Sequence, residues 1–228
     1  MKTSPLLDAD INIKGFLNLL ESIRKSSVEK IVFVSTGGAI YGEPTNLPAS
    51  EKTLEDPLSP YGLSKLAGEK YLRWYNREYG IPFSVIRPAN VYGPRQDPLG
   101  EAGVISIFLG KLTRNEPMVI FGDGKDTRDY VYVEDVVNAC LLAMKSNHNE
   151  IFNIGTGIET SVLDLVEIIR KVTNKPDAPY RFDPPRPGDV HRISLDSTKA
   201  ETMLGWRPKT NLEDGITKVW EWFKKSNQ

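Results

Sequence analysis

The sequence predicts an α/β fold built around a parallel sheet. Two short, β-branched apolar runs, "KIVFVS" (30–35) and "FSVIRP" (83–88), are too hydrophobic for solvent-facing edges and suit buried parallel strands. A helix is expected between them, from about Tyr61 to Tyr79. Strand, crossover helix and strand form a βαβ unit, so the two strands are expected to run parallel.

The other elements follow in order. Apolar residues at helical spacing predict a helix over "DADINIKGFLNLLESIRKS" (8–26). After Pro88 the pattern predicts a helix near 103–114, two short strands around a turn in "PMVIFGDGKDTRDYVYV", a helix in "EDVVNACLLAMKS" and a strand in "EIFNIG". The remainder predicts a helix in "TSVLDLVEIIRKVT", a loop with a short strand, and two closing helices capped by Asp196 and Asn211.

Composition excludes several classes of protein. A chain of 228 residues can bury a sizeable core, as one domain or a domain plus a lobe. The net charge of -1 gives no reason to expect nucleic acid or an anionic membrane as a partner, and the apolar runs are too short to span a bilayer. The single cysteine, Cys140, excludes an internal disulfide framework and agrees with a reducing cytoplasm, where we expect the protein. With two histidines, we expect no His-rich metal site.

Tyr61 and Lys65 are the first candidates for chemistry. Residues four apart share one face of a helix, and a lysine ammonium beside a phenol is expected to lower the phenol pKa, so that the tyrosine can act as an acid or base. The spacing alone is weak evidence, because many amphipathic helices contain it by chance. Ser35 and Thr36 strengthen it: they end the first buried strand, where ligands of doubly wound sheets bind, and would complete a Ser/Thr–Tyr–Lys site.

Six motifs in register then carry a specific resemblance. They are "STGGAIYGEP", "SPYGLSKLAGEKY", "IRPANVYGPRQ", "IFGDGKDTRDYVYVEDV", "FNIGTG" and "PPRPGDV". In this order the chain resembles the extended short-chain dehydrogenase/reductases, and within them the NAD-dependent epimerases and dehydratases of UDP-glucose (UDP-galactose) 4-epimerase type. The resemblance implies a Rossmann-like parallel sheet with a smaller C-terminal α/β lobe for the substrate. It assigns 1–90 with about 133–155 to the catalytic domain, and 91–132 with 156–228 to the lobe.

The resemblance also implies roles for residues. Tyr61 resembles the catalytic base, which takes a proton from the sugar 4-hydroxyl while hydride passes to NAD, and Lys65 its partner, which also holds the nicotinamide ribose. Asn12, Ser35 and Pro88 fall in cofactor-contacting positions. The implied substrate contacts are Asn90, Arg128 and Arg186 for the pyrophosphate, Asp189 for the ribose, and Val119 and Phe121 for the uracil ring. Without the resemblance, these would be read as a turn residue, solvated charges and core residues.

One position departs from the family. The catalytic hydroxyl usually lies four residues before the "YG" tyrosine, here Tyr41, but that position is Gly37. We therefore expect Thr36, one residue earlier, to supply it.

A second departure concerns the cofactor. The family begins with a strand and a Gly-rich turn that cradles the pyrophosphate of NAD. The chain has no such segment before its first predicted helix, and "GTG" (155–157) is interpreted as a tight turn. We therefore expect a truncated member with impaired or absent NAD binding. Its apolar edge strand, 30–35, is expected to cause self-association.

Three functions stay open at this point. The chain is a fragment that keeps the UDP-sugar pocket, an active epimerase completed by another chain, or a non-catalytic module that binds a nucleotide sugar or a protein. A nucleotide-sugar 4,6-dehydratase or reductase is a further alternative, because these enzymes share the lobe motifs.

Overall fold

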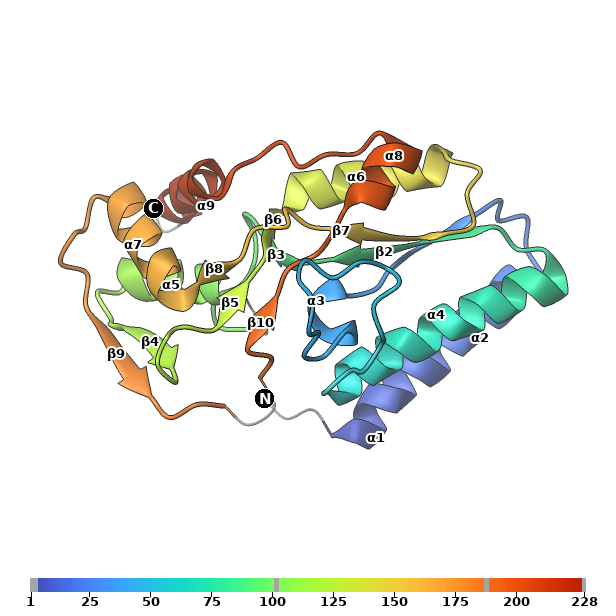
Figure 1. Ribbon diagram of the computed structural model, residues 1–228, viewed down its shortest axis with the longest axis horizontal. Helices are drawn as coiled ribbons and strands as arrows, with labels where there is room; N and C mark the ends of the chain where they lie inside the picture. Colours follow the sequence, from blue (N-terminus) through green and yellow to red (C-terminus); the bar gives the residue numbers. More distant parts are fainter. Residues whose placement is uncertain (1–3, 101–102, 187–188, 227–228) are drawn as a thin grey trace.

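The computed structural model describes residues 4–100, 103–186 and 189–226. Figure 1 shows a parallel sheet between two layers of helices, and beside it a second region of small sheets with α5, α7 and α9. The helices are α1 (Pro5–Asp8), the π-helical η1 (Ala9–Lys14), α2 (Gly15–Ile23), α3 (Gly37–Ile40), α4 (Pro60–Tyr79), α5 (Val104–Thr113), α6 (Val133–Lys145), α7 (Val162–Thr173), α8 (Thr198–Leu204) and α9 (Leu212–Ser226). The strands are β1 (Ile31–Val34), β2 (Phe83–Pro88), β3 (Asn90–Tyr92), β4 (Met118–Phe121), β5 (Thr127–Arg128), β6 (Tyr130–Tyr132), β7 (Ile151–Ile154), β8 (Thr160–Ser161), β9 (Tyr180–Asp183) and β10 (Arg192–Ile193).

The larger sheet has the order β1-β2-β7, with all three strands parallel. Every residue of the central strand β2 is buried, as its continuous apolar run predicts. Figure 1 places α6 and α8 on one face of this sheet and α4 with α2 on the other. The prediction of an α/β fold with a parallel sheet is therefore confirmed.

The first strand forms an edge of this sheet. Within the described ranges β1 pairs with β2 alone, and Val34 at its end is 45% exposed. Helix α6 packs on β1 and β2 and leaves Val137, Leu141 and Met144 exposed at positions i, i+4 and i+7. We call these three residues and Val34 the β1–α6 surface.

The second region differs from the local prediction. Segment 117–133, expected as two strands around a turn, contains β4, β5 and β6, and no two of these pair with each other. Instead β4 pairs with β9, β6 with β3, and β5 lies between β10 and β8. The prediction was wrong because these partners lie far away in the sequence. Buried side chains of β3, β4 and β6 form one core with α5, α7 and α9.

The helices that carry the site have clear boundaries. Ser59 caps α4 by accepting a hydrogen bond from the Gly62 amide at 3.2 Å, and Gly80 ends it in the left-handed conformation at φ +69°. The single helix predicted over 8–26 is interrupted by η1, and its Ile11 and Leu19 are exposed rather than packed. Within the described part of the chain, no helix combines the length and the apolar character that crossing a membrane requires.

Candidate active site

A cavity of about 410 Å³ lies at the carboxyl ends of β1 and β2. Ligands of open parallel sheets bind at this end of the strands. Five predicted site residues line the cavity: Ser35, Thr36, Tyr61, Pro88 and Asn90. Its other lining residues are Val34, Ala89, Val91, Tyr92, Gln96, Gly103, Val104, Ile105 and Tyr130. The structure therefore gathers residues from β1, β2, β3 and α4 that lie far apart in the sequence.

Tyr61 and Lys65 lie in the first two turns of α4, beside this cavity. The Tyr61 side chain is partly exposed, and the Lys65 Nζ lies 5.8 Å from the centre of its ring. The Lys65 ammonium donates a hydrogen bond to the Val34 carbonyl oxygen at 3.0 Å. Lysine therefore joins the start of α4 to the end of β1, which holds the tyrosine next to the strand end.

The expectation of a lowered phenol pKa is wrong for this structure. Burial raises the pKa of Tyr61 above its ordinary value of 10.0, and the negative charge of Asp8 raises it further. Burial lowers the pKa of Lys65, and Asp8 partly opposes this change. The spacing of Tyr61 and Lys65 can be read from the sequence. The effect of Asp8 cannot, because Asp8 lies on another helix, α1.

The structure explains why position 37 carries glycine. A Cβ atom on Gly37 would collide with the Leu195 side chain and lie 3.0 Å from the Arg87 carbonyl oxygen. A serine or threonine at position 37 would therefore meet the core under the loop and force a rearrangement. Thr36 is partly exposed and lines the cavity, so it stays our candidate for the catalytic hydroxyl.

Ser35 is buried, and its hydroxyl turns away from solvent. It donates a hydrogen bond of 2.5 Å to Oε1 of Glu69, a buried residue of α4. Glu69 also accepts two hydrogen bonds from the buried Arg87 of β2, at 2.9 Å from Nε and 2.6 Å from Nη2. Sequence reasoning missed Glu69 and Arg87, although a charged residue inside the apolar run "FSVIRP" signals a buried partner.

The remaining cofactor and substrate candidates come from several elements. Asn12 lies partly buried in η1, which packs on α4. Asn90 begins β3, and its Oδ1 lies within 3.1 Å of the position that a Cβ on Gly38 would occupy. Arg128 of β5 donates from Nη1 to the carbonyl oxygens of Thr127 at 2.8 Å and His191 at 3.4 Å. Asp189 is exposed.

Three further substrate candidates are Val119 and Phe121 of β4 and Arg186 of the loop after β9. Strand β4 alternates, with Met118 and Ile120 in the core and Val119 and Phe121 on the opposite, half-buried face. The Arg186 guanidinium lies 3.7 Å from the centre of the Phe121 ring. This cation–π contact combines a flat apolar surface with a cation, which suits a base ring joined to phosphates.

The "GTG" turn already holds a carboxylate of the protein itself. The buried Asp129 accepts hydrogen bonds from the amides of Thr156 and Gly157, both at 2.9 Å, and from the Leu195 amide at 3.2 Å. This agrees with the interpretation of 155–157 as a tight turn.

Two residues that line the cavity, Tyr92 and Tyr130, have buried hydroxyls that meet no partner among the described residues. The Tyr130 hydroxyl is buried and makes no hydrogen bond within the described part of the chain, and Tyr130 lines the cavity. A buried, unpaired hydroxyl is rare unless a ligand or water meets it. Nothing in the local pattern "DYVYV" signals this role, because alternating tyrosines also suit an ordinary core strand.

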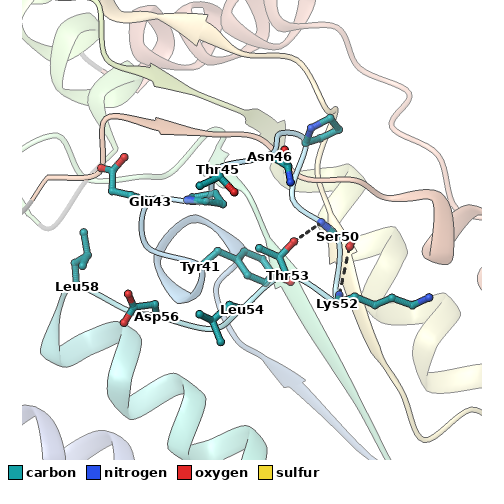
Figure 2. Close-up of a pocket in the computed structure, with 12 residues that line it drawn as sticks. Tyr41, Glu43, Thr45, Asn46, Ser50, Lys52, Thr53, Leu54, Asp56 and Leu58 are labelled. Atoms are coloured by element: carbon teal, nitrogen blue, oxygen red, sulfur yellow. Dashed lines mark hydrogen bonds between the residues drawn. The ribbon is translucent and has the colours of Figure 1, made fainter.

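A second cavity, of about 520 Å³, lies within the loop that follows Tyr41 (Figure 2). Its lining includes Thr45, Ser50 and Thr53, and Figure 2 shows the Ser50 amide bonded to the Thr53 hydroxyl. None of the predicted catalytic or substrate residues lines it. We therefore place the candidate site in the cavity at the strand ends.

Comparison with known proteins identifies the family to which the chain is similar. Residues 2–155 match the NAD dependent epimerase/dehydratase family. UDP-glucose 4-epimerase of Mycolicibacterium smegmatis is 47% identical over 225 residues, which cover 98% of this chain and 72% of that protein.

Two solved structures are similar over the whole described fold. The crystal structure of Thermotoga maritima UDP-glucose 4-epimerase with UDP-glucose superposes with a TM-score of 0.96 at 50% identity, covering 100% of this chain and 74% of that one. The Thermus thermophilus UDP-glucose 4-epimerase in complex with NAD gives a TM-score of 0.91 at 42% identity, covering 98% and 73%. The chain thus spans about three quarters of each of these proteins.

Proposed function

The chain belongs to the NAD-dependent epimerase/dehydratase family, and we propose that its cavity at the ends of β1 and β2 acts on UDP-glucose and UDP-galactose as a 4-epimerase site. One observation carries the proposal: Thr36, Tyr61 and Asn90 line a single cavity in a fold that closely matches UDP-glucose 4-epimerases. The relatives named for this activity support the choice of substrate.

The residues beside the cavity fit the nicotinamide end of NAD. A phenol, an ammonium and a threonine hydroxyl are the donors expected next to a nicotinamide ribose, and Tyr61, Lys65 and Thr36 supply them. In the proposal Lys65 and Asn12 hold the nicotinamide end of NAD, while Ser35 and Pro88 form the cavity wall beside it. When bound, NAD supplies reversible hydride acceptance, which the protein itself has no group to provide.

The protein's own groups bind the substrate and move one proton. Tyr61 exchanges the proton of the sugar 4-oxygen, and Thr36 donates a hydrogen bond to the same oxygen. Asn90, Arg128 and Arg186 hold the pyrophosphate, since arginine offers a planar, charged pair of donors to phosphate oxygens. Val119 and Phe121 pack on the uracil ring, and Asp189 accepts from the ribose.

The first prediction tests this substrate assignment by calorimetric titration of the purified chain with UDP-glucose. Arg186→Ala is expected to weaken binding about tenfold or more, because it removes a charge-assisted hydrogen bond to phosphate. The matched control is Arg207→Ala, an exposed arginine whose partner is Glu201. Equal affinity of wild type and Arg186→Ala contradicts the phosphate role, and a folded wild-type chain that does not bind UDP-glucose overturns the substrate assignment.

A companion titration with NAD addresses the cofactor. In the described structure the Thr156 and Gly157 amides donate to Asp129 and the Gly155 amide donates to the Ser197 hydroxyl, so the 155–157 turn offers no cradle for the pyrophosphate of NAD. We therefore expect NAD to bind this chain more weakly than UDP-glucose. Micromolar affinity for NAD would show that the expectation of impaired binding is wrong.

The second prediction concerns self-association through the β1–α6 surface, with a second copy of the chain as the partner. An apolar sheet edge beside exposed apolar helix residues favours pairing, because both lose contact with water. Light scattering at increasing concentration is expected to show dimers or larger species. Leu141→Lys should shift them toward monomer, whereas Leu54→Lys, at an exposed leucine elsewhere, should not. A wild-type chain that stays monomeric contradicts the prediction.

A further inference from the structure

A buried carboxylate lies close to the Tyr61–Lys65 pair and has no role in the function proposed above. Asp8, the last residue of α1, is 4% exposed, and its Oδ1 accepts a hydrogen bond from the Ser64 hydroxyl. Ser64, also 4% exposed, lies on α4 between the two site residues, three positions after Tyr61 and one before Lys65. A carboxylate is costly to bury unless it is bonded, so its placement calls for a reason.

The path of the chain explains how Asp8 reaches this place. It immediately precedes the π-helical turn η1, and both α1 and η1 pack on α4. A π-helical turn is wider than an α-helical turn and is frequently found at functional sites. The N-terminal segment thus brings a negative charge against the first turns of α4.

Few other charges face the pair. On α4 itself the charged groups between positions 61 and 69 are Lys65, whose ammonium is bonded to the Val34 carbonyl, and the buried Glu69, whose carboxylate is paired with Arg87. Strand β1 and helix α3 contain no ionisable side chain. On η1, Asp10 and Lys14 are exposed and form an ion pair with each other at 3.6 Å. Among the described residues, Asp8 is therefore the buried carboxylate near the pair that forms no salt bridge with an arginine or lysine, since Glu69 is paired with Arg87.

A negative charge acts on the two groups in a defined way. It opposes ionisation of a phenol, because a phenolate would be a like charge, and it favours protonation of an amine. Both effects agree with the pKa directions of the two groups. Burial is the larger cause of the raised pKa of Tyr61, and Asp8 raises it further. Burial lowers the pKa of Lys65, and Asp8 opposes this change.

We propose that Asp8 is a positioning residue for the Tyr61–Lys65 pair: its bond to Ser64 fixes α4 against α1, and its charge favours the ammonium form of Lys65 and the neutral phenol form of Tyr61. The inference rests on the proposed function only in treating Tyr61 as the group that moves the proton. The protonation states belong to the chain itself and are measured without turnover.

The test is an NMR titration of the chain with ¹³C-labelled tyrosine ring carbons and ¹³C-labelled lysine Cε. Signals are assigned with Tyr61→Phe and Lys65→Met. Asp8→Asn removes the charge and keeps the size of the side chain and an oxygen that accepts from Ser64. The matched control, Asp10→Asn, removes an exposed carboxylate two residues further on.

In Asp8→Asn the pKa of Tyr61 and the pKa of Lys65 are both expected to shift down, because the substitution removes a negative charge from the surroundings of both groups. Asp10→Asn should leave both unchanged. A merely structural role gives a different result: loosened packing would hydrate Lys65 and shift its pKa up toward 10.5. An upward shift of Lys65, or an unchanged Tyr61, overturns the proposal.

Ser64→Ala provides an independent variant. It keeps the charge and removes the hydrogen bond, so the pKa of Tyr61 is expected to stay above its ordinary value while the chain unfolds at a lower temperature. Loss of the raised pKa in this variant would contradict the assignment of the effect to charge. Failure of UDP-glucose binding together with the expected downward shifts in Asp8→Asn would reject the proposed function and leave the inference about Asp8 standing.

Discussion

Replacing Arg87 with alanine is expected to lower the free energy of unfolding by about 3–5 kcal/mol, because it leaves a buried charge without its partner. The Arg87 side chain is fully buried on the central strand, and its main partner, Glu69, is 1% exposed. Burial opposes the charge of Arg87, yet the hydrogen bonds and the charge of Glu69 outweigh it and raise the arginine pKa. Without Arg87, Glu69 must ionise in a dry interior or take up a proton.

The measurement is urea denaturation of wild type and variant. Arg192→Ala is the matched control, since Arg192 also forms a two-bond pair with a glutamate, Glu159, at 2.9 and 2.7 Å, but its side chain is 64% exposed. Exposed pairs contribute about 0–1 kcal/mol, so the control should change little. Equal losses in Arg87→Ala and Arg192→Ala would contradict the role of burial. Combining Arg87→Met with Glu69→Leu should recover much of the loss, because no buried charge is then left unpaired.

This buried pair belongs to a polar network that crosses the whole sheet. Ser35, at the end of β1, donates to Glu69, and Arg87 of β2 donates to the Tyr41 hydroxyl at 2.8 Å. Tyr41 in turn donates to Oδ1 of Asn153 in β7 at 2.7 Å, and burial raises the Tyr41 pKa to about 12. The network therefore fixes the strand end that carries Thr36, and its loss is expected to disturb the site as well as stability.

The parallel sheet and the helix α4 could be predicted from the sequence because their signals are local. Apolar runs of four to six residues mark β1 and β2, and a proline after Ser59 with a glycine at position 80 marks the two ends of α4. The paired strands outside the β1-β2-β7 sheet could not be predicted, because β4 meets β9 some sixty residues later and neither strand has enough length to specify a partner.

The candidate site was likewise predicted only where its signals are local in the sequence. Spacing and motif order indicated Tyr61, Lys65 and Thr36, but not the groups that set their environment. Asp8 approaches from a segment more than fifty residues earlier, and no pattern around it indicates that it bonds to Ser64 of α4. The direction of the Tyr61 pKa was therefore predicted wrongly, since it depends on burial and on a charge from another helix rather than on the spacing of the pair.

Tyr61→Phe is expected to reduce the conversion of UDP-galactose to UDP-glucose, measured with saturating NAD, by roughly 10²–10⁴-fold, the range for loss of a positioned acid–base group. The substitution keeps the ring and removes the hydroxyl. Binding of UDP-glucose should stay close to that of wild type, because the proposed binding contacts lie with Asn90, Arg128 and Arg186. A loss in kcat without a matching loss in affinity separates proton transfer from binding.

A control variant and the pH dependence of the rate both test the assignment of proton transfer to Tyr61. Tyr71→Phe is the matched control, because Tyr71 is a partly exposed tyrosine further along the same helix, and it should retain full turnover.

The wild-type rate should also rise about tenfold per pH unit between neutral pH and the Tyr61 pKa, because that pKa lies above 10.0 and only the phenolate accepts a proton. Turnover that survives Tyr61→Phe, or that does not increase with pH, would place the proton-transfer group elsewhere in the cavity. A wild-type chain that binds both ligands without turnover would show that holding the substrate beside this phenol is insufficient for the reaction.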